Sequence, residues 1–129
     1  MDIHVQSPGG MLIDARFGDF TVSTDQTVAD GGTNSAPSPF DLFLASIGTC
    51  AGLYALRFCQ KREIDTAGLG IQLETVRDPE SRRLTEINLH LSLPPAFPDK
   101  YQKAIVRAIN QCAVKKAIVD PPEISTIIR

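Results

Sequence analysis

The chain has 129 residues, of which 43% are hydrophobic and 22% are charged. These proportions are typical of a globular protein that buries one core without disulfides or metal ions, and we predict a single domain over residues 1–129. Lys and Arg number 13 against 15 Asp and Glu, so the net charge is -2 and no broad positive field favours nucleic acid or anionic lipid. The chain starts with no cationic segment leading into an apolar run, so we expect a cytoplasmic protein.

The first part of the chain predicts antiparallel strands. Residues 11–17 and 20–24 alternate between apolar and polar side chains, and only a Gly-Asp pair separates the two runs. This spacing predicts a β-hairpin. A further strand is expected over residues 3–6, and residues 29–38, rich in Gly, Ser, Asn and Pro, are expected to form an irregular surface segment.

A helix is predicted to begin after Ser38. Ser38 supplies a hydroxyl N-cap, Pro39 suits the first helical position, and Asp41 places a carboxylate in the first turn. From Leu42 to Leu56 the 15 residues carry no charge and the apolar side chains point in nearly every direction. Because roughly 20 apolar residues are needed to span a bilayer, we expect no membrane span. We predict a helix buried on several sides and covered in part by a second subunit.

The second half of the chain predicts another hairpin and more helix. Residues 69–73 and 87–93 alternate in the manner of strands on either side of a polar turn. An amphipathic helix is expected over residues 99–112, with Asp99 as its cap, followed by a shorter helix over residues 113–119 and a final strand over residues 124–128. This order predicts an α+β fold with antiparallel sheets.

The three cysteines form an odd set without a C-x-x-C pair, which argues against both a disulfide framework and a zinc ribbon. Cys59 follows Cys50 by nine residues, a rotation of about 900° in an ideal helix, so the two side chains point in opposite directions. A disulfide between these two residues is therefore not expected. The spacing leaves open whether Cys50 and Cys112 are buried apolar side chains or reactive thiols.

No metal or cofactor site is predicted. His4 and His90 are the two histidines of the chain, and His90 shares the polar face of its predicted strand with Glu86 and Asn88. This pattern favours a surface residue over a metal ligand. The glycine pair at positions 31–32 lacks the Lys-Ser/Thr signature of a phosphate loop.

The segment SPFDLFLASIGTC, from Ser38 to Cys50, resembles a motif of the OsmC/Ohr family. Gly31-Gly32 before it, and Cys112 with a proline turn and a terminal strand after it, extend the resemblance over nearly the whole chain. The resemblance implies an OsmC-like fold, in which antiparallel sheets wrap around a long central helix in an intertwined homodimer with active sites at the subunit interface. It also implies reduction of organic or inorganic hydroperoxides in oxidative stress defence, with a small hydroperoxide as substrate and an external dithiol as reductant.

The same resemblance assigns roles to single residues. Cys50 would attack the peroxide, and Cys112 would be the resolving thiol. Cys50 lies about twelve residues past the N-cap of its helix, too far for that helix end to lower its pKa, so a cation is expected to do so. Family members use an arginine near the N-terminus, for which Arg16 is the candidate; the alternative is a solvated charge paired with Asp14.

One position departs from the family pattern. The peroxidase branches carry a glutamate ten residues before the first cysteine, where it holds the arginine, and Phe40 stands there in this chain. The neighbouring Asp41 matches the acidic residue of less characterised OsmC-like branches, and it serves either as an orienting carboxylate or as a helix-capping one. A second hypothesis is therefore a non-catalytic protein that binds a small apolar ligand in the interface cavity. Peroxide consumption in the presence of a dithiol distinguishes the two.

Overall fold

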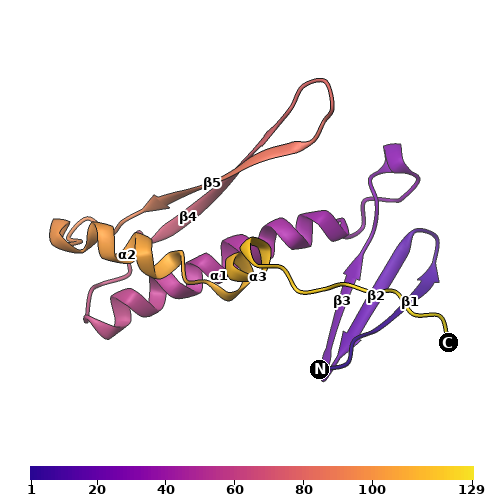
Figure 1. Ribbon diagram of the computed structural model, residues 1–129, viewed down its shortest axis with the longest axis horizontal. Helices are drawn as coiled ribbons and strands as arrows, with labels where there is room; N and C mark the ends of the chain where they lie inside the picture. The colour runs from indigo at the N-terminus through magenta and orange to yellow at the C-terminus, as the bar shows by residue number, and fades with distance from the viewer. The chain divides into compact units, whose positions relative to one another are not determined.

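The computed structural model describes all 129 residues and contains two compact units, residues 1–45 and 46–129, which are described separately. Antiparallel sheets and a long helix confirm the predicted α+β class. The elements in chain order are β1 (His4–Gly9), β2 (Leu12–Phe17), β3 (Phe20–Thr24), the 3₁₀ turn η1 (Val28–Asp30), α1 (Pro39–Lys61), β4 (Gly70–Arg77), β5 (Leu84–Ser92), the 3₁₀ turn η2 (Asp99–Tyr101), α2 (Gln102–Ile109) and α3 (Ala113–Val119) (Figure 1).

The first unit contains a three-stranded antiparallel sheet in the order β1-β2-β3 (Figure 1). The predicted hairpin between β2 and β3 is confirmed, because Phe17 pairs with Phe20 across a two-residue turn. Gly18 in this turn has a φ of 53°, a conformation that glycine adopts without steric cost. β1 is longer than expected, because its pairing with β2 continues to Gly9 beyond a shift in register after Gln6.

The segment between β3 and α1 is organised by Asp25, whose side chain is only 1% exposed. One carboxylate oxygen accepts hydrogen bonds from the backbone N–H and the hydroxyl of both Thr33 and Ser35, at 2.8 to 3.2 Å. The other oxygen accepts the N–H of Gln26 at 2.8 Å. The bonds from Ser35 are the largest reason why the pKa of Asp25 lies well below its ordinary value. Gly32 packs against this cluster, and a Cβ there would overlap the carbonyl of Gln26.

The predicted start of α1 is confirmed by a reciprocal pair of hydrogen bonds. The backbone N–H of Asp41 donates to the hydroxyl of Ser38 at 3.1 Å, and the carboxylate of Asp41 accepts the N–H of Ser38 at 3.0 Å. This is a capping box with aspartate as its acid. The Ser38 N–H is the main cause that holds the pKa of Asp41 below its ordinary value, followed by the Ser38 hydroxyl.

The core of the second unit lies where one stripe of α1 meets the β4–β5 hairpin and α2. Paired positions of the two strands alternate between this core and solvent: Ile71 opposite Leu91 packs on the core, and Gln72 opposite the exposed His90 faces away. The buried core residues are Ala51, Ala55, Phe58, Cys59, Phe97, Ile105 and Ile109.

Only one stripe of α1 is buried within the chain, and the expected cover of its other sides by a second subunit stays a prediction. The buried residues are Ile47, Ala51, Ala55, Phe58 and Cys59. On another side Leu53 remains 42% exposed. By length and composition alone this 23-residue helix would be able to cross a membrane, a property that core helices of soluble proteins share. Its packing against a hairpin and a second helix is that of a core helix.

Two expectations for the C-terminal part were wrong, and a third was confirmed. Residues 124–128 form no strand, because no strand of this chain pairs with them and the preceding Pro121-Pro122 supplies no N–H donors. The helix expected over residues 99–112 begins as a 3₁₀ turn with Pro98 as its N-cap in place of Asp99, and α2 ends at Ile109. The helix expected over residues 113–119 is present as α3.

We predict that Asp25→Asn lowers the thermal midpoint of unfolding at pH 7, because a neutral amide cannot accept five hydrogen bonds from N–H and O–H donors as a carboxylate does. The folded pKa is depressed, so the contribution of Asp25 is complete above its ordinary pKa of 3.8 and is lost as the pH falls below it. The difference from wild type should therefore shrink in acid. Asp19→Asn, in the exposed β2–β3 turn, should leave the midpoint unchanged at every pH; a loss as large as that of Asp25→Asn would contradict this assignment.

Candidate functional site

Two cysteines that are 62 residues apart in the sequence meet in the second unit. Cys50 is half-buried in the middle of α1, and Cys112 is 1% exposed at the link between α2 and α3. Cys112 is the N-cap of α3, and its sulfur accepts the backbone N–H of Lys115 at 3.3 Å. The turn after α2 therefore presents both a thiol and the first amides of α3 toward Cys50.

The surroundings of Cys50 favour its thiolate. Burial raises its pKa, but the backbone N–H of Val114, the thiol of Cys112 and the N–H of Ala113 all donate to its sulfur, and together they lower the pKa below the ordinary cysteine value. Cys112 has the opposite balance. Its pKa is raised by burial and by the neighbouring Cys50, against the lowering effect of the Lys115 N–H. As the pH rises, Cys50 is thus the first of the two thiols to ionise.

These donors change the expectation that a cation must activate Cys50. The lowered pKa comes from amides at the start of a different helix, not from the distant end of α1. Arg16 lies in the first unit, exposed on β2 and opposite Thr21, and its proximity to Cys50 stays a prediction. Asp14 accepts the hydroxyl of Ser23 at 2.7 Å, and no ion pair joins it to Arg16.

Phe40 and Asp41 occupy the first turn of α1. The ring of Phe40 lies 5.3 Å from that of Phe43, so the position of the family's glutamate is taken by an aromatic pair. Asp41 is engaged in the capping box with Ser38, which accounts for its carboxylate as a helix cap. Its role as an orienting carboxylate stays a prediction.

The surroundings of the remaining candidates, Cys59 and His90, are those of structural residues. Cys59 is fully buried in the core, and burial raises its pKa, as expected for a thiol that points away from Cys50. His90 lies on the exposed face of the hairpin, where its Nε2 is 2.9 Å from a carboxylate oxygen of Glu74. No group of three His, Cys, Asp or Glu side chains in the 129 residues is arranged to hold a metal ion.

Comparison with known proteins gives the family. Residues 32–127 match the family described as OsmC-like protein. The chain belongs to the OsmC-like family. Protein YhfA of Escherichia coli is 31% identical over 97 residues, which cover 74% of this chain and 71% of that protein.

Solved structures of the family share the fold. A Psychrobacter arcticus protein assigned to the osmotic stress and detoxification response is 26% identical with a TM-score of 0.74, over 89% of this chain and 85% of that one. An OsmC-like protein of Mycoplasma pneumoniae superposes with a TM-score of 0.71 at 19% identity, over 93% and 87% of the two chains. The organic hydroperoxide resistance protein OhrB of Bacillus subtilis gives 0.52 at 18% identity, over 91% and 90%. The long central helix and antiparallel sheets are thus those of the OsmC-like fold.

The two amides that bond to Cys50 were not anticipated from the sequence. A signal for them existed, because a helix predicted to start at Ala113 leaves its first N–H groups without partners in its own helix. What the sequence does not show is that α1 passes beside this helix start. The pairing depends on contacts between residues far apart in the chain.

We predict that Cys50 reacts with iodoacetamide at a lower pH than Cys59 and Cys112, because only its pKa is lowered and it is the most exposed of the three. The rate at each cysteine is followed by mass spectrometry of digested protein between pH 5 and about 10, which brackets the ordinary thiol pKa of about 8.5. The modification curve of Cys50 should have the lowest midpoint. Equal midpoints for Cys50 and Cys112 would contradict the asymmetry of the site.

Proposed function

We propose that this protein is a thiol-dependent hydroperoxide reductase acting in the oxidative stress response, with Cys50 and Cys112 as its redox pair. The observation that carries the proposal is that Cys50 and Cys112 are neighbours whose thiols affect each other's pKa, lowering that of Cys50 and raising that of Cys112. Family membership supports it. So do structural relatives from Elizabethkingia anophelis and Bacillus subtilis, which are organic hydroperoxide resistance proteins.

The proposed chemistry needs two thiols and no cofactor. The Cys50 thiolate attacks one peroxide oxygen, the O–O bond breaks, and the other oxygen takes a proton and leaves as an alcohol, or as water from hydrogen peroxide. Cys50 becomes a sulfenic acid. The Cys112 thiol then attacks the Cys50 sulfur, forming a disulfide and releasing water. An external dithiol reduces this disulfide by two exchange steps and is itself oxidised.

We predict that purified protein consumes tert-butyl hydroperoxide when dithiothreitol is present, and that a Cys50–Cys112 disulfide forms when the reductant is removed. Cys50→Ser should abolish consumption. Cys112→Ser should stop at the sulfenic acid, trapped by dimedone and seen by mass spectrometry, because no second thiol is in contact with Cys50. Cys59→Ala is the matched control, since it removes a thiol of the same helix that points into the core, and it should keep both consumption and the disulfide.

The same assay tests Arg16. We propose that it further lowers the pKa of Cys50 or binds the peroxide, so Arg16→Met should slow the first step. Below the thiol pKa, each unit by which that pKa rises reduces the thiolate fraction about tenfold. Arg82→Met, in the exposed β4–β5 turn, removes the same charge elsewhere. Identical pH profiles for wild type, Arg16→Met and Arg82→Met would remove Arg16 from the site.

We also propose that the protein is a homodimer, as the family resemblance implies, and that it is cytoplasmic. Large apolar side chains remain exposed on the sheet of the first unit and on α1, a surface that a second subunit would bury. Added Cβ atoms at Gly48 and Gly52, one turn apart on α1, would meet nothing within 4 Å, so another helix has room to approach. The exposed residues include Val5, Ile13, Phe20, Phe40 and Leu53.

For a dimer of this kind, the unfolding midpoint should rise with protein concentration, because folding and association are coupled. Chemical denaturation at protein concentrations a hundredfold apart measures this shift, and light scattering gives the mass. A stable monomer of 14.0 kDa at micromolar concentration would exclude the dimer.

Ligand binding without catalysis is the second candidate function. It is favoured by Phe40 at the position of the family's glutamate and by an apolar groove of about 530 Å³ in the second unit. The groove is lined by residues of β5, α2 and α3, among them Leu89, Val106 and Ile118. If wild-type Cys50 proves unreactive toward peroxide, this candidate replaces the enzyme.

A further inference from the structure

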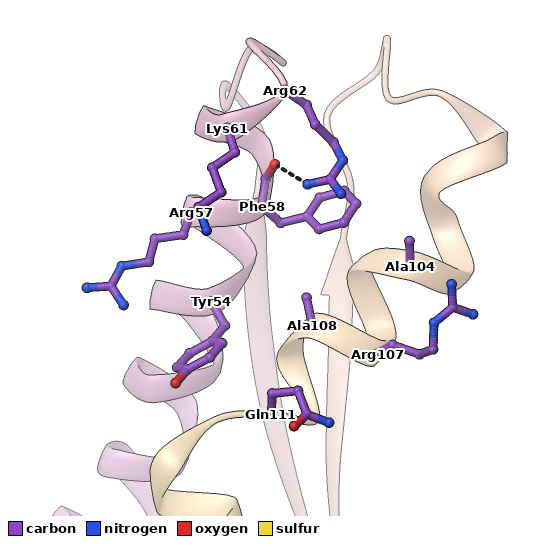
Figure 2. A pocket seen from close by; sticks show the side chains of 9 residues that line it. All are labelled: Tyr54, Arg57, Phe58, Lys61, Arg62, Ala104, Arg107, Ala108 and Gln111. Carbon is purple, nitrogen blue, oxygen red and sulfur yellow. Dashed lines mark hydrogen bonds between the residues drawn. The ribbon is translucent and has the colours of Figure 1, made fainter.

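A second groove, separate from the apolar one, lies between the C-terminal half of α1 and α2. Its volume is about 500 Å³, within the range of sites that hold small molecules. Its floor is apolar: Phe58 comes from α1, and Ala104 and Ala108 come from α2 (Figure 2). The two alanines leave the space between the helices open.

Four cations and no carboxylate line this groove. Arg57 and Lys61 stand one turn apart on the α1 side, and Arg107 stands on the α2 side (Figure 2). Arg62 lies across one end. None of the four forms a salt bridge within the chain. The groove therefore carries uncompensated positive charge on a protein whose net charge is -2.

Arg62 is held in place while the other cations extend into solvent. Its guanidinium lies 3.6 Å from the centre of the Phe58 ring and donates to the Phe58 carbonyl at 3.2 Å, as Figure 2 shows. It also lies 5.3 Å from the ring centre of Tyr101. Arg57 and Arg107 point outward on opposite sides in Figure 2, so the floor is flanked by positive charge on both rims. One preset guanidinium and exposed cations around an apolar floor suit an anion attached to an apolar body.

We propose that this groove binds a small amphipathic anion, with a phosphate or carboxylate head between the cations and an apolar body on Phe58, Ala104 and Ala108. A nucleic acid is disfavoured, because the protein has a net charge of -2 and only four of its 13 Lys and Arg residues line the groove. An apolar neutral ligand would leave four like charges uncompensated, whereas an anion offsets their repulsion.

The groove adjoins the cysteine pair without including it. Tyr54 on its wall follows Cys50 by one helical turn, and Gln111 immediately precedes Cys112. Binding nevertheless requires neither thiol, so the inference is independent of peroxide reduction. The variant Cys50→Ser/Cys112→Ser should bind the anion with unchanged affinity even if the proposed enzyme activity fails.

The chain contains a built-in probe of this groove. It has no tryptophan and two tyrosines, Tyr54 in the groove wall and Tyr101 beside Arg62. Intrinsic tyrosine fluorescence thus reports on this end of the molecule. Titrations use octyl phosphate and octanoate below their micelle concentrations, with inorganic phosphate and octanol as the isolated head and tail, and calorimetry gives the stoichiometry.

We predict saturable binding of one octyl phosphate or octanoate per chain that weakens as salt is added. Inorganic phosphate and octanol should each bind at least about tenfold more weakly, because each makes only half of the contacts. Arg57→Gln/Lys61→Gln should weaken octyl phosphate binding at least about tenfold, since both residues are exposed and carry the charge that pairs with the head. Arg82→Gln/Arg83→Gln, in the β4–β5 turn, is the matched control with the same charge change and should bind normally.

Four results of the binding titrations would overturn the proposal. These are no saturable binding, inorganic phosphate as tight as octyl phosphate, equal losses in the two double variants, and an Arg57→Gln/Lys61→Gln protein that binds normally. The competing occupant of the groove is a second copy of this chain. Light scattering on the Arg57→Gln/Lys61→Gln variant tests for it. If neutralising Arg57 and Lys61 changes the oligomeric state, the groove is a contact between subunits and not a ligand site.

Discussion

The contact between Cys112 and Cys50 is the interaction on which the geometry of the site depends. Cys112 closes the turn after α2, accepts the N–H of Lys115 as the cap of α3, and brings its thiol beside Cys50, where it helps to lower the pKa of Cys50. Because one residue does all three, the position of the second thiol and the direction of the first amides of α3 are set together. Any change in the α2–α3 turn should move both.

The site also depends on which face of α1 is buried. The stripe that includes Ala51 and Ala55 is packed against the rest of the second unit, which holds the helix in place. Cys50 lies beside this stripe and remains half-buried, so its sulfur meets donors from α3 without losing access to solvent. Cys59, inside the stripe, is fully buried and its pKa is raised. These two thiols of α1 thus differ in pKa because they lie on different faces of the helix. Helical geometry already predicts that they point in different directions.

Patterns that involve neighbouring residues predicted the fold well. Both hairpins, the Ser38–Asp41 cap and the helix from Ala113 to Val119 follow from alternation, turn residues and capping, which act over a few positions. The strand expected over residues 124–128 failed, because a strand also needs an edge to pair with, and alternation says nothing about that partner. The burial expected for α1 on its other sides likewise depends on a partner, the second subunit expected to cover part of the helix, and it stays a prediction.

The sequence predicted which cysteines form the site but not which contacts they make. Family resemblance singled out Cys50 and Cys112, whereas the amides of Ala113 and Val114 became visible only when α1 and α3 were brought together. Asp25 was missed altogether. Its five hydrogen bonds reach residues one to ten positions away through an irregular loop, for which no periodic pattern exists.

The positive charge of the groove was likewise not predictable from the sequence. A net charge of -2 argued against an anionic partner, and along the sequence Arg57 and Arg107 are ordinary polar residues of two separate helices. Packing α1 against α2 places their cations around one groove, which no carboxylate lines. Coulomb interactions weaken with distance and are screened by salt, so a bound anion interacts most strongly with the cations that line the groove. A protein that is acidic as a whole can therefore present an attractive surface to an anion, provided the anion is small enough to meet only that surface.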